Sequence, residues 1–115
     1  MAKVFGIHKL ALHSGINGED FEQFLQEVLP QIPAVHGWKV YALRGDRGDR
    51  EGKYLLLFEI ESVEARERFA PVGGSQTPEA EQFDQATKGI FERWGTFANA
   101  LDPAFTDYVV VAETT

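Results

Sequence analysis

The chain has 115 residues, of which 43% are hydrophobic and 25% are charged, a length and composition typical of one compact domain. The balance of 11 basic against 18 acidic residues gives a net charge of −7, which argues against nucleic-acid binding because that needs a cationic surface. There is no cysteine, which excludes disulfides, thiolate metal sites and cysteine nucleophiles. The sequence also has no long apolar run, and its N-terminus does not have a basic segment followed by an apolar one. We therefore expect a cytoplasmic protein without a membrane partner.

The first predicted elements are a strand and a helix. Residues 3–13 combine β-branched, aromatic and aliphatic side chains, which predicts a strand. The segment that follows Asn17 has apolar residues at the spacing of one helix face. These residues are Phe21, Phe24, Leu25, Val28, Leu29 and Ile32. Pro30 and Pro33 are expected to end this helix.

A hairpin and a short helix are predicted next. Residues 37–43 and 53–61 are strand-like, and residues 44–52 between them consist only of charged residues and glycine. This pattern predicts two antiparallel strands joined by an exposed connection. Ser62 is suited to cap a short helix over residues 63–69.

The last third of the chain predicts a long helix and a final strand. Thr77 is a suitable N-cap, with Pro78 at the first helical position. The apolar stripe comprises Phe83, Ile90, Phe91, Trp94, Phe97, Ala98 and Leu101, and it has helical spacing. The Asp-Pro pair at residues 102–103 is expected to stop the helix, and residues 107–113 predict a β-branched strand.

This order of elements predicts a single α+β domain over residues 1–115. Right-handed crossovers around the hairpin produce a ferredoxin-like sandwich, in which helices cover one face of a four-stranded antiparallel sheet. The other face is bare, and alternating residues along three strands are expected to make both faces of the sheet substantially apolar. They are Lys39, Tyr41 and Leu43, then Leu55, Leu57 and Glu59, then Val109 and Val111. A second copy of the chain is the simplest partner for such a face, because two sheets can close into a barrel.

Three stretches resemble the dimeric α+β barrel superfamily, which includes antibiotic-biosynthesis-monooxygenase-like and EthD-like proteins. They are residues 6–12, which lead through Gly15 into the first helix, residues 32–38 (IPAVHGW), and residues 58–65 (FEIESVEA). The resemblance implies a homodimer with a small-molecule cavity between sheet and helices. It does not select a reaction, because the superfamily includes cofactor-independent oxygenases, haem degraders, isomerases and proteins without assigned activity. We expect no cofactor.

Glu59 is the first candidate for chemistry, because it interrupts an apolar strand and a carboxylate there must be paired or face water. It is expected to be either a general base with a raised pKa or the ion-pair partner of a residue such as Lys9. In the enzyme hypothesis, Glu59 or His13 transfers the proton and Tyr41 donates a hydrogen bond to the substrate oxygen.

Four further residues are candidates for contacting a ligand, namely His8, Lys9, Trp38 and Trp94. Each also has a structural interpretation, as a surface or core residue. The histidine spacing matches no metal motif, so no metal site is predicted. The leading hypothesis is a homodimer that binds a small apolar or aromatic molecule; if it is an enzyme, we expect cofactor-independent monooxygenation or isomerisation. The alternative is a non-catalytic dimeric binding or regulatory module, and the sequence leaves both open. A third possibility is haem handling by the same fold, although the long C-terminal helix has no histidine.

Overall fold

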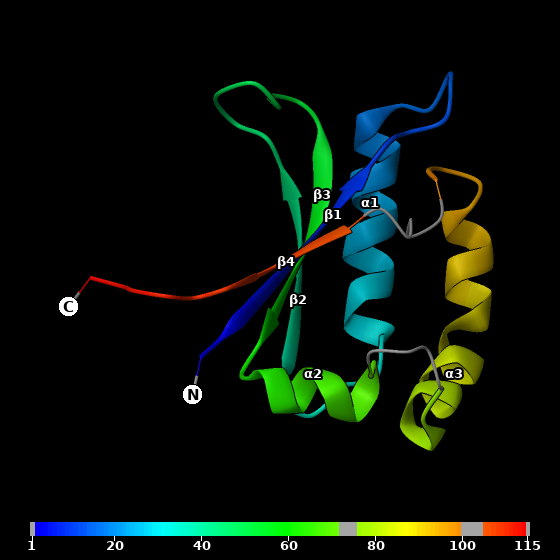
Figure 1. Cartoon of the computed structure of the whole chain (residues 1–115). Helices are drawn as coiled ribbons and strands as arrows, with labels where there is room; N and C mark the ends of the chain where they lie inside the picture. The colour runs from blue at the N-terminus through cyan, green and yellow to red at the C-terminus, as the bar shows by residue number, and fades with distance from the viewer. Residues whose placement is uncertain (1, 72–75, 100–104, 115) are drawn as a thin grey trace.

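A computed structural model describes residues 2–71, 76–99 and 105–114 (Figure 1). Its elements are β1 (Val4–Leu10), α1 (Gly18–Val28), the short 3-10 helix η1 (Leu29–Gln31), β2 (Trp38–Arg44), β3 (Tyr54–Ile60), α2 (Val63–Phe69), α3 (Pro78–Trp94) and β4 (Phe105–Val109). The four strands form one sheet in the order β2-β3-β1-β4, and all neighbours are antiparallel. The predicted four-stranded antiparallel sheet is therefore confirmed.

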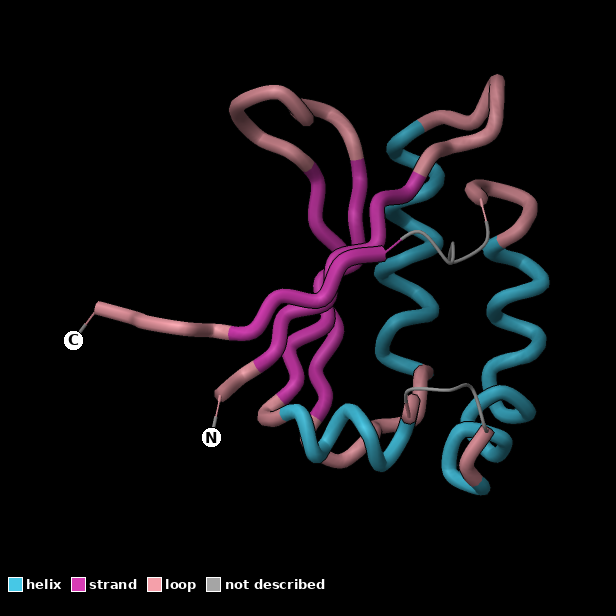
Figure 2. Tube along the Cα trace, in the orientation of Figure 1, coloured by secondary structure: helices cyan, strands magenta, loops and turns pink. Residues whose placement is uncertain are grey.

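The molecule has two layers. Helices α1 and α3 lie on one side of the sheet, and α2 crosses one end of the same side, whereas no described element covers the opposite side (Figures 1 and 2). We call this uncovered side the open face. No helix in the described parts of the chain is long and apolar enough to cross a membrane.

Local sequence signals account for where the helices begin. The side chains of Asn17, Ser62 and Thr77 accept hydrogen bonds from backbone N–H groups in the first turns of α1, α2 and α3. Such bonds satisfy donors that have no partner within the helix. Both caps predicted for the later helices, Ser62 and Thr77, are confirmed.

The core lies between α1, the sheet and the C-terminal end of α3. Phe21 is fully buried and meets Tyr54 and Trp94 edge to face, with ring centroids 5.3 and 5.7 Å apart. Phe24 stacks on Phe97 at 4.7 Å. Edge-to-face and offset aromatic pairs add stability beyond the burial of area. This packing fixes the distance between α1 and α3 at one end of the molecule.

The long helix is shorter than the sequence predicts. It ends at Trp94 instead of continuing along the apolar stripe, because the chain after Gly95 turns back to pair with the segment that follows β1. The N–H of His13 donates to the carbonyl of Phe97 at 2.9 Å, and the N–H of Asn99 donates to that of Ala11 at 3.0 Å. The predicted stop at residues 102–103, like Leu101, lies outside the described residues.

The last strand begins earlier than predicted and ends at Val109. Its partner strand β1 begins at Val4, which is opposite Val109, and one further bond joins the N–H of Val110 to the carbonyl of Lys3. Beyond that point no described residue pairs with this segment, and Val111 is 95% exposed. The predicted strand over residues 107–113 therefore covers only part of β4.

The register assigns every strand residue to one face. Lys39, Tyr41 and Leu43 lie opposite Glu59, Leu57 and Leu55, and this set continues across β1 as Phe5, Ile7 and Lys9. None of these side chains faces the core, so they belong to the open face. Val109, by contrast, lies on the helix side, because it pairs with buried Val4.

Candidate functional site

The candidate site is a cavity of about 730 Å³ between the sheet and the helices. Its floor is the helix side of the sheet, and its other walls come from η1, the segment before β2, α2 and α3. The lining residues are Gly6, His8, Leu29, Ile32, Pro33, Ala34, Val35, Trp38, Val40, Leu56, Phe58, Ile60, Arg66, Phe69, Ala70, Pro71, Phe83, Phe91, Trp94, Phe105 and Asp107. The set is mostly aliphatic and aromatic, as in many small-molecule sites.

Strand alternation explains why these residues meet. Every second residue of a strand points to the same face, and the register aligns His8 with Leu56 and with Phe105. On the neighbouring strands, Val40 lies opposite Phe58. The aligned residues form one continuous apolar floor.

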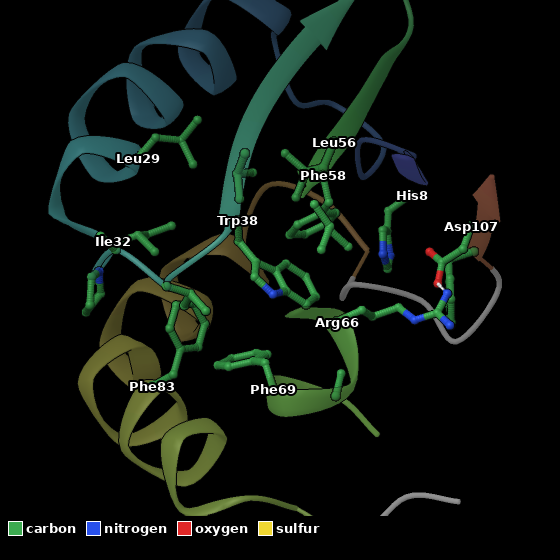
Figure 3. A pocket seen from close by; sticks show the side chains of 18 of the residues that line it. His8, Leu29, Ile32, Trp38, Leu56, Phe58, Arg66, Phe69, Phe83 and Asp107 are labelled. Carbon is green, nitrogen blue, oxygen red and sulfur yellow. Dashed lines mark hydrogen bonds and ion pairs between the residues drawn. The ribbon is translucent and has the colours of Figure 1, made fainter. Parts of the chain in front are cut away.

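Aromatic rings make up one end of the cavity (Figure 3). The Trp38 ring lies 5.3 Å from that of Phe69 and 5.9 Å from that of Phe58, and Phe69 meets Phe83 edge to face at 5.4 Å. The indole N–H of Trp38 donates to the carbonyl of Ala65 at 3.3 Å. This bond holds the ring of Trp38, a lining residue, against α2.

The other end of the cavity holds its charged and titratable side chains, His8, Arg66 and Asp107 (Figure 3). Arg66 Nη1 donates to Asp107 Oδ2 at 3.1 Å, with both side chains about one-fifth exposed, at 21% and 23%. The His8 ring stacks on Phe105 at 5.1 Å and meets Phe58 edge to face at 4.9 Å. The cavity is therefore aromatic at one end and polar at the other.

Gly6 makes room for this polar end. Asp107 is paired with Gly6 across β1 and β4, and a Cβ atom at position 6 would lie only 2.8 Å from Asp107 Oδ1. Cβ atoms essentially never lie so close to another heavy atom. Without a side chain at Gly6, the carboxylate lies over the sheet on the cavity side, within reach of Arg66.

Three of the four residues predicted to contact a ligand line the cavity, namely His8, Trp38 and Trp94. Trp94 is also a core residue, 1% exposed, with its indole N–H donating to the carbonyl of Asn99 at 3.2 Å. Lys9 is placed differently. It follows His8 on β1 and so points to the open face, where it is exposed.

The three residues predicted to be catalytic lie outside the cavity. Glu59 and Tyr41 are on the open face, where Tyr41 Oη donates to Glu59 Oε1 at 3.0 Å and Lys3 Nζ donates to Glu59 Oε2 at 2.8 Å. His13 lies beyond the end of β1, with Nε2 2.9 Å from the carbonyl oxygen of Gly95. The structure thus joins Glu59 to Tyr41 and leaves His13 apart.

Of the two alternatives for Glu59, the structure supports the ion pair and not the raised pKa. The hydrogen bond from Lys3 and then that from Tyr41 lower the pKa of the carboxyl below its ordinary value, and they outweigh the opposing effect of desolvation. The same pairing raises the pKa of Lys3. The ion-pair interpretation of Glu59 is supported, but the cation is Lys3 instead of Lys9.

Comparison with solved structures identifies the fold of this chain. No family model and no curated protein matches the chain. A dabb family protein with a ferredoxin-like fold from Mesorhizobium loti aligns with 99% of this chain and 100% of its own, at 16% identity and a TM-score of 0.52. This chain has the ferredoxin-like fold. It is the fold that the order of the predicted elements indicated.

A second solved structure is SnoaB, a cofactor-independent oxygenase from Streptomyces nogalater. It aligns with 100% of this chain and 97% of its own, at 13% identity and a TM-score of 0.47. Within the described part of the present ferredoxin-like chain, no group of three or more His, Cys, Asp or Glu residues is arranged to hold a metal ion.

Sequence reasoning missed two residues at the polar end, Arg66 and Asp107. Arg66 is one of several charged residues on a short helix, so nothing in the local sequence distinguishes it as a cavity residue. Asp107 carries a weak signal, because it is a carboxylate in a β-branched and aromatic segment and has a glycine as cross-strand partner. That pairing becomes visible only once the strand order and register are known.

Proposed function

We propose that this protein binds one small, largely apolar or aromatic molecule in the cavity between sheet and helices. The observation that carries the proposal is the lining: aromatic rings at one end, a few polar groups at the other, and a volume of about 730 Å³. Small-molecule sites typically enclose about 300–1,000 Å³ and combine apolar walls with a few polar groups that orient the ligand. A flat ligand would lie against Trp38 and Phe69, with its oxygen atoms toward Arg66.

The binding proposal is tested with N-phenyl-1-naphthylamine, a neutral probe that fluoresces when it enters apolar surroundings. We expect the protein to bind it, and Phe69→Ala to weaken binding about fivefold, since one ring contact contributes roughly 1 kcal/mol. The matched control is Phe5→Ala, which removes the same ring from the open face and should leave the affinity unchanged. An absence of binding, or equal weakening by both variants, would contradict the proposal.

For the reaction, the proposal assigns proton transfer to His8. Unlike Glu59 and His13, His8 lines the cavity, and imidazole is the side chain best suited to exchange a proton near neutral pH. His8 would take a proton from an acidic C–H or O–H group of the ligand. This first step is shared by isomerisation, in which the proton returns to another ligand atom, and by cofactor-independent oxygenation.

In the oxygenation, the methylene group of an aromatic ketone loses a proton to His8 and the carbanion reacts with dioxygen. The proton returns to the peroxide, which eliminates water, so that one oxygen atom becomes a carbonyl and the other leaves in water. We expect dioxygen uptake with a tricyclic aromatic ketone that has an acidic methylene, and a loss of at least about 100-fold in His8→Gln, with probe binding retained. Absence of uptake in the wild type would favour the alternative, a non-catalytic binding module.

We also propose that two copies of the chain pair through their open faces. The support is that apolar and aromatic side chains on this face remain partly accessible to water. Tyr108 is 56% exposed, and four half-buried apolar residues lie on the same face, namely Phe5, Ile7, Leu55 and Leu57. Contiguous apolar patches of this kind are often interfaces. In this arrangement Glu59, Tyr41 and Lys3 form a polar group within the interface, and each subunit keeps its own cavity.

A further inference from the structure

Arg66 is the one lysine or arginine among the described residues that line the cavity, and its charge is already compensated. Its Nη1 donates to Asp107 Oδ2 at 3.1 Å, and its Nε lies 3.7 Å from Glu67 Oε2. One guanidinium therefore has two carboxylates beside it. The local balance of these three groups is negative.

The Asp107 carboxylate reaches the cavity because of its partner in the sheet. It lies over Gly6, where any Cβ atom would come within 2.8 Å of Oδ1, and its other oxygen accepts the bond from Arg66. Figure 3 shows the two side chains extended toward each other at one end of the cavity. The ion pair thus joins α2 to β4 and forms part of the cavity wall.

The ion pair changes what the cavity can accept. An arginine alone in an apolar cavity is a strong site for a carboxylate or sulfonate, through two parallel charge-assisted hydrogen bonds. Here Asp107 occupies that position and repels a second anion, at a site where low exposure weakens screening by water. A neutral carbonyl or hydroxyl group meets no such repulsion and can still accept a hydrogen bond from the remaining N–H groups of Arg66.

We propose that Asp107 is a specificity-determining residue that makes the cavity select neutral aromatic ligands over anionic ones. This inference rests on the proposed binding function and names the class of ligand. It predicts that the natural ligand carries a carbonyl, hydroxyl or similar uncharged polar group at the end nearest Arg66.

The test uses two competitors of the same size, 1-naphthylmethanol and 1-naphthoate, each measured by displacement of bound N-phenyl-1-naphthylamine. In the wild type the alcohol should displace the probe at a concentration at least about tenfold lower than the carboxylate. In Asp107→Asn the affinity for 1-naphthoate should rise about tenfold, and that for the alcohol should stay within about twofold. Asp46→Asn, which makes the same charge change in the exposed hairpin connection, should behave as the wild type.

The outcomes separate the two proposals. If the neutral probe does not bind the wild type, the binding function itself fails. If the probe binds but Asp107→Asn gains no affinity for 1-naphthoate, only the specificity role of Asp107 is overturned. Should Asp107→Asn not fold, Arg66→Met serves instead. It leaves the carboxylates without their cation, so 1-naphthoate should bind about tenfold more weakly, whereas the alcohol loses one hydrogen bond and should weaken by clearly less than that. Unchanged binding of 1-naphthoate to that variant would also overturn the proposal.

Discussion

Neighbouring residues of one strand have opposite roles in this molecule. His8 points into the cavity, whereas Lys9, the next residue, points to the open face. The same alternation separates Phe58, which lines the cavity, from Glu59, which does not. Chemical type therefore identifies which residues are unusual, but strand parity decides which of them can touch a ligand.

The pairing of Glu59 predicts a pH-dependent stability. Because its pKa is lowered in the folded state, its contribution to stability is present above its ordinary pKa and is lost as the pH falls through the lowered folded-state value. We expect Glu59→Gln to have a lower urea midpoint than the wild type at pH 7, and the difference to disappear at acid pH. Glu51→Gln, in the exposed hairpin connection, is the control and should follow the wild type throughout. A difference that stayed constant across the acid range would contradict the role assigned to Glu59.

At the scale of elements, local sequence signals predicted where helices begin more accurately than where helices and strands end. Ser62 and Thr77 cap α2 and α3 as predicted, because a cap depends on side-chain contacts only a few residues away. The end of α3 depends instead on residues 95–99 pairing with residues 11–13. Helical spacing continues past Gly95, so the periodicity alone could not reveal that competing interaction.

The bounds of β4 illustrate the same limit. The β-branched run at residues 109–111 favours a strand wherever a partner is available. The partner β1 begins at Val4, however, and β4 therefore ends at Val109. Strand propensity is a property of the segment, whereas strand length is a property of the pair.

At the scale of the whole molecule, the main feature is the difference between the two faces of the sheet. One face carries three helices and the cavity, and the other carries a half-buried apolar surface with Glu59, Lys3 and Tyr41 in it (Figures 1 and 2). A ligand site and a self-association surface can then occupy one small sheet without sharing side chains.

The proposed dimer is tested by light scattering of the purified chain over a concentration series. The wild type should have twice the 12.9 kDa mass of the chain. Leu57→Asp should have the mass of one chain, because Leu57 lies between Ile7 and Tyr41 on the open face. A carboxylate buried there without a partner opposes association. Ala86→Asp, at an exposed site of α3 on the helix side of the sheet, should remain dimeric. A wild type with the mass of one chain would contradict the pairing of open faces.

The sequence by itself determined the elements, their order and the general architecture, because helical and strand periodicity, caps and the glycine-rich hairpin connection act over short distances. It also identified the aromatic candidates His8, Trp38 and Trp94, since an apolar cavity is built from the same residues as a core. Only the tertiary structure decided the polar end. Arg66 and Asp107 are 41 residues apart, and they meet because the register of β4 sets Asp107 opposite Gly6. A register shift of one residue would turn every side chain of that strand to the other face, so no local pattern could specify the pair.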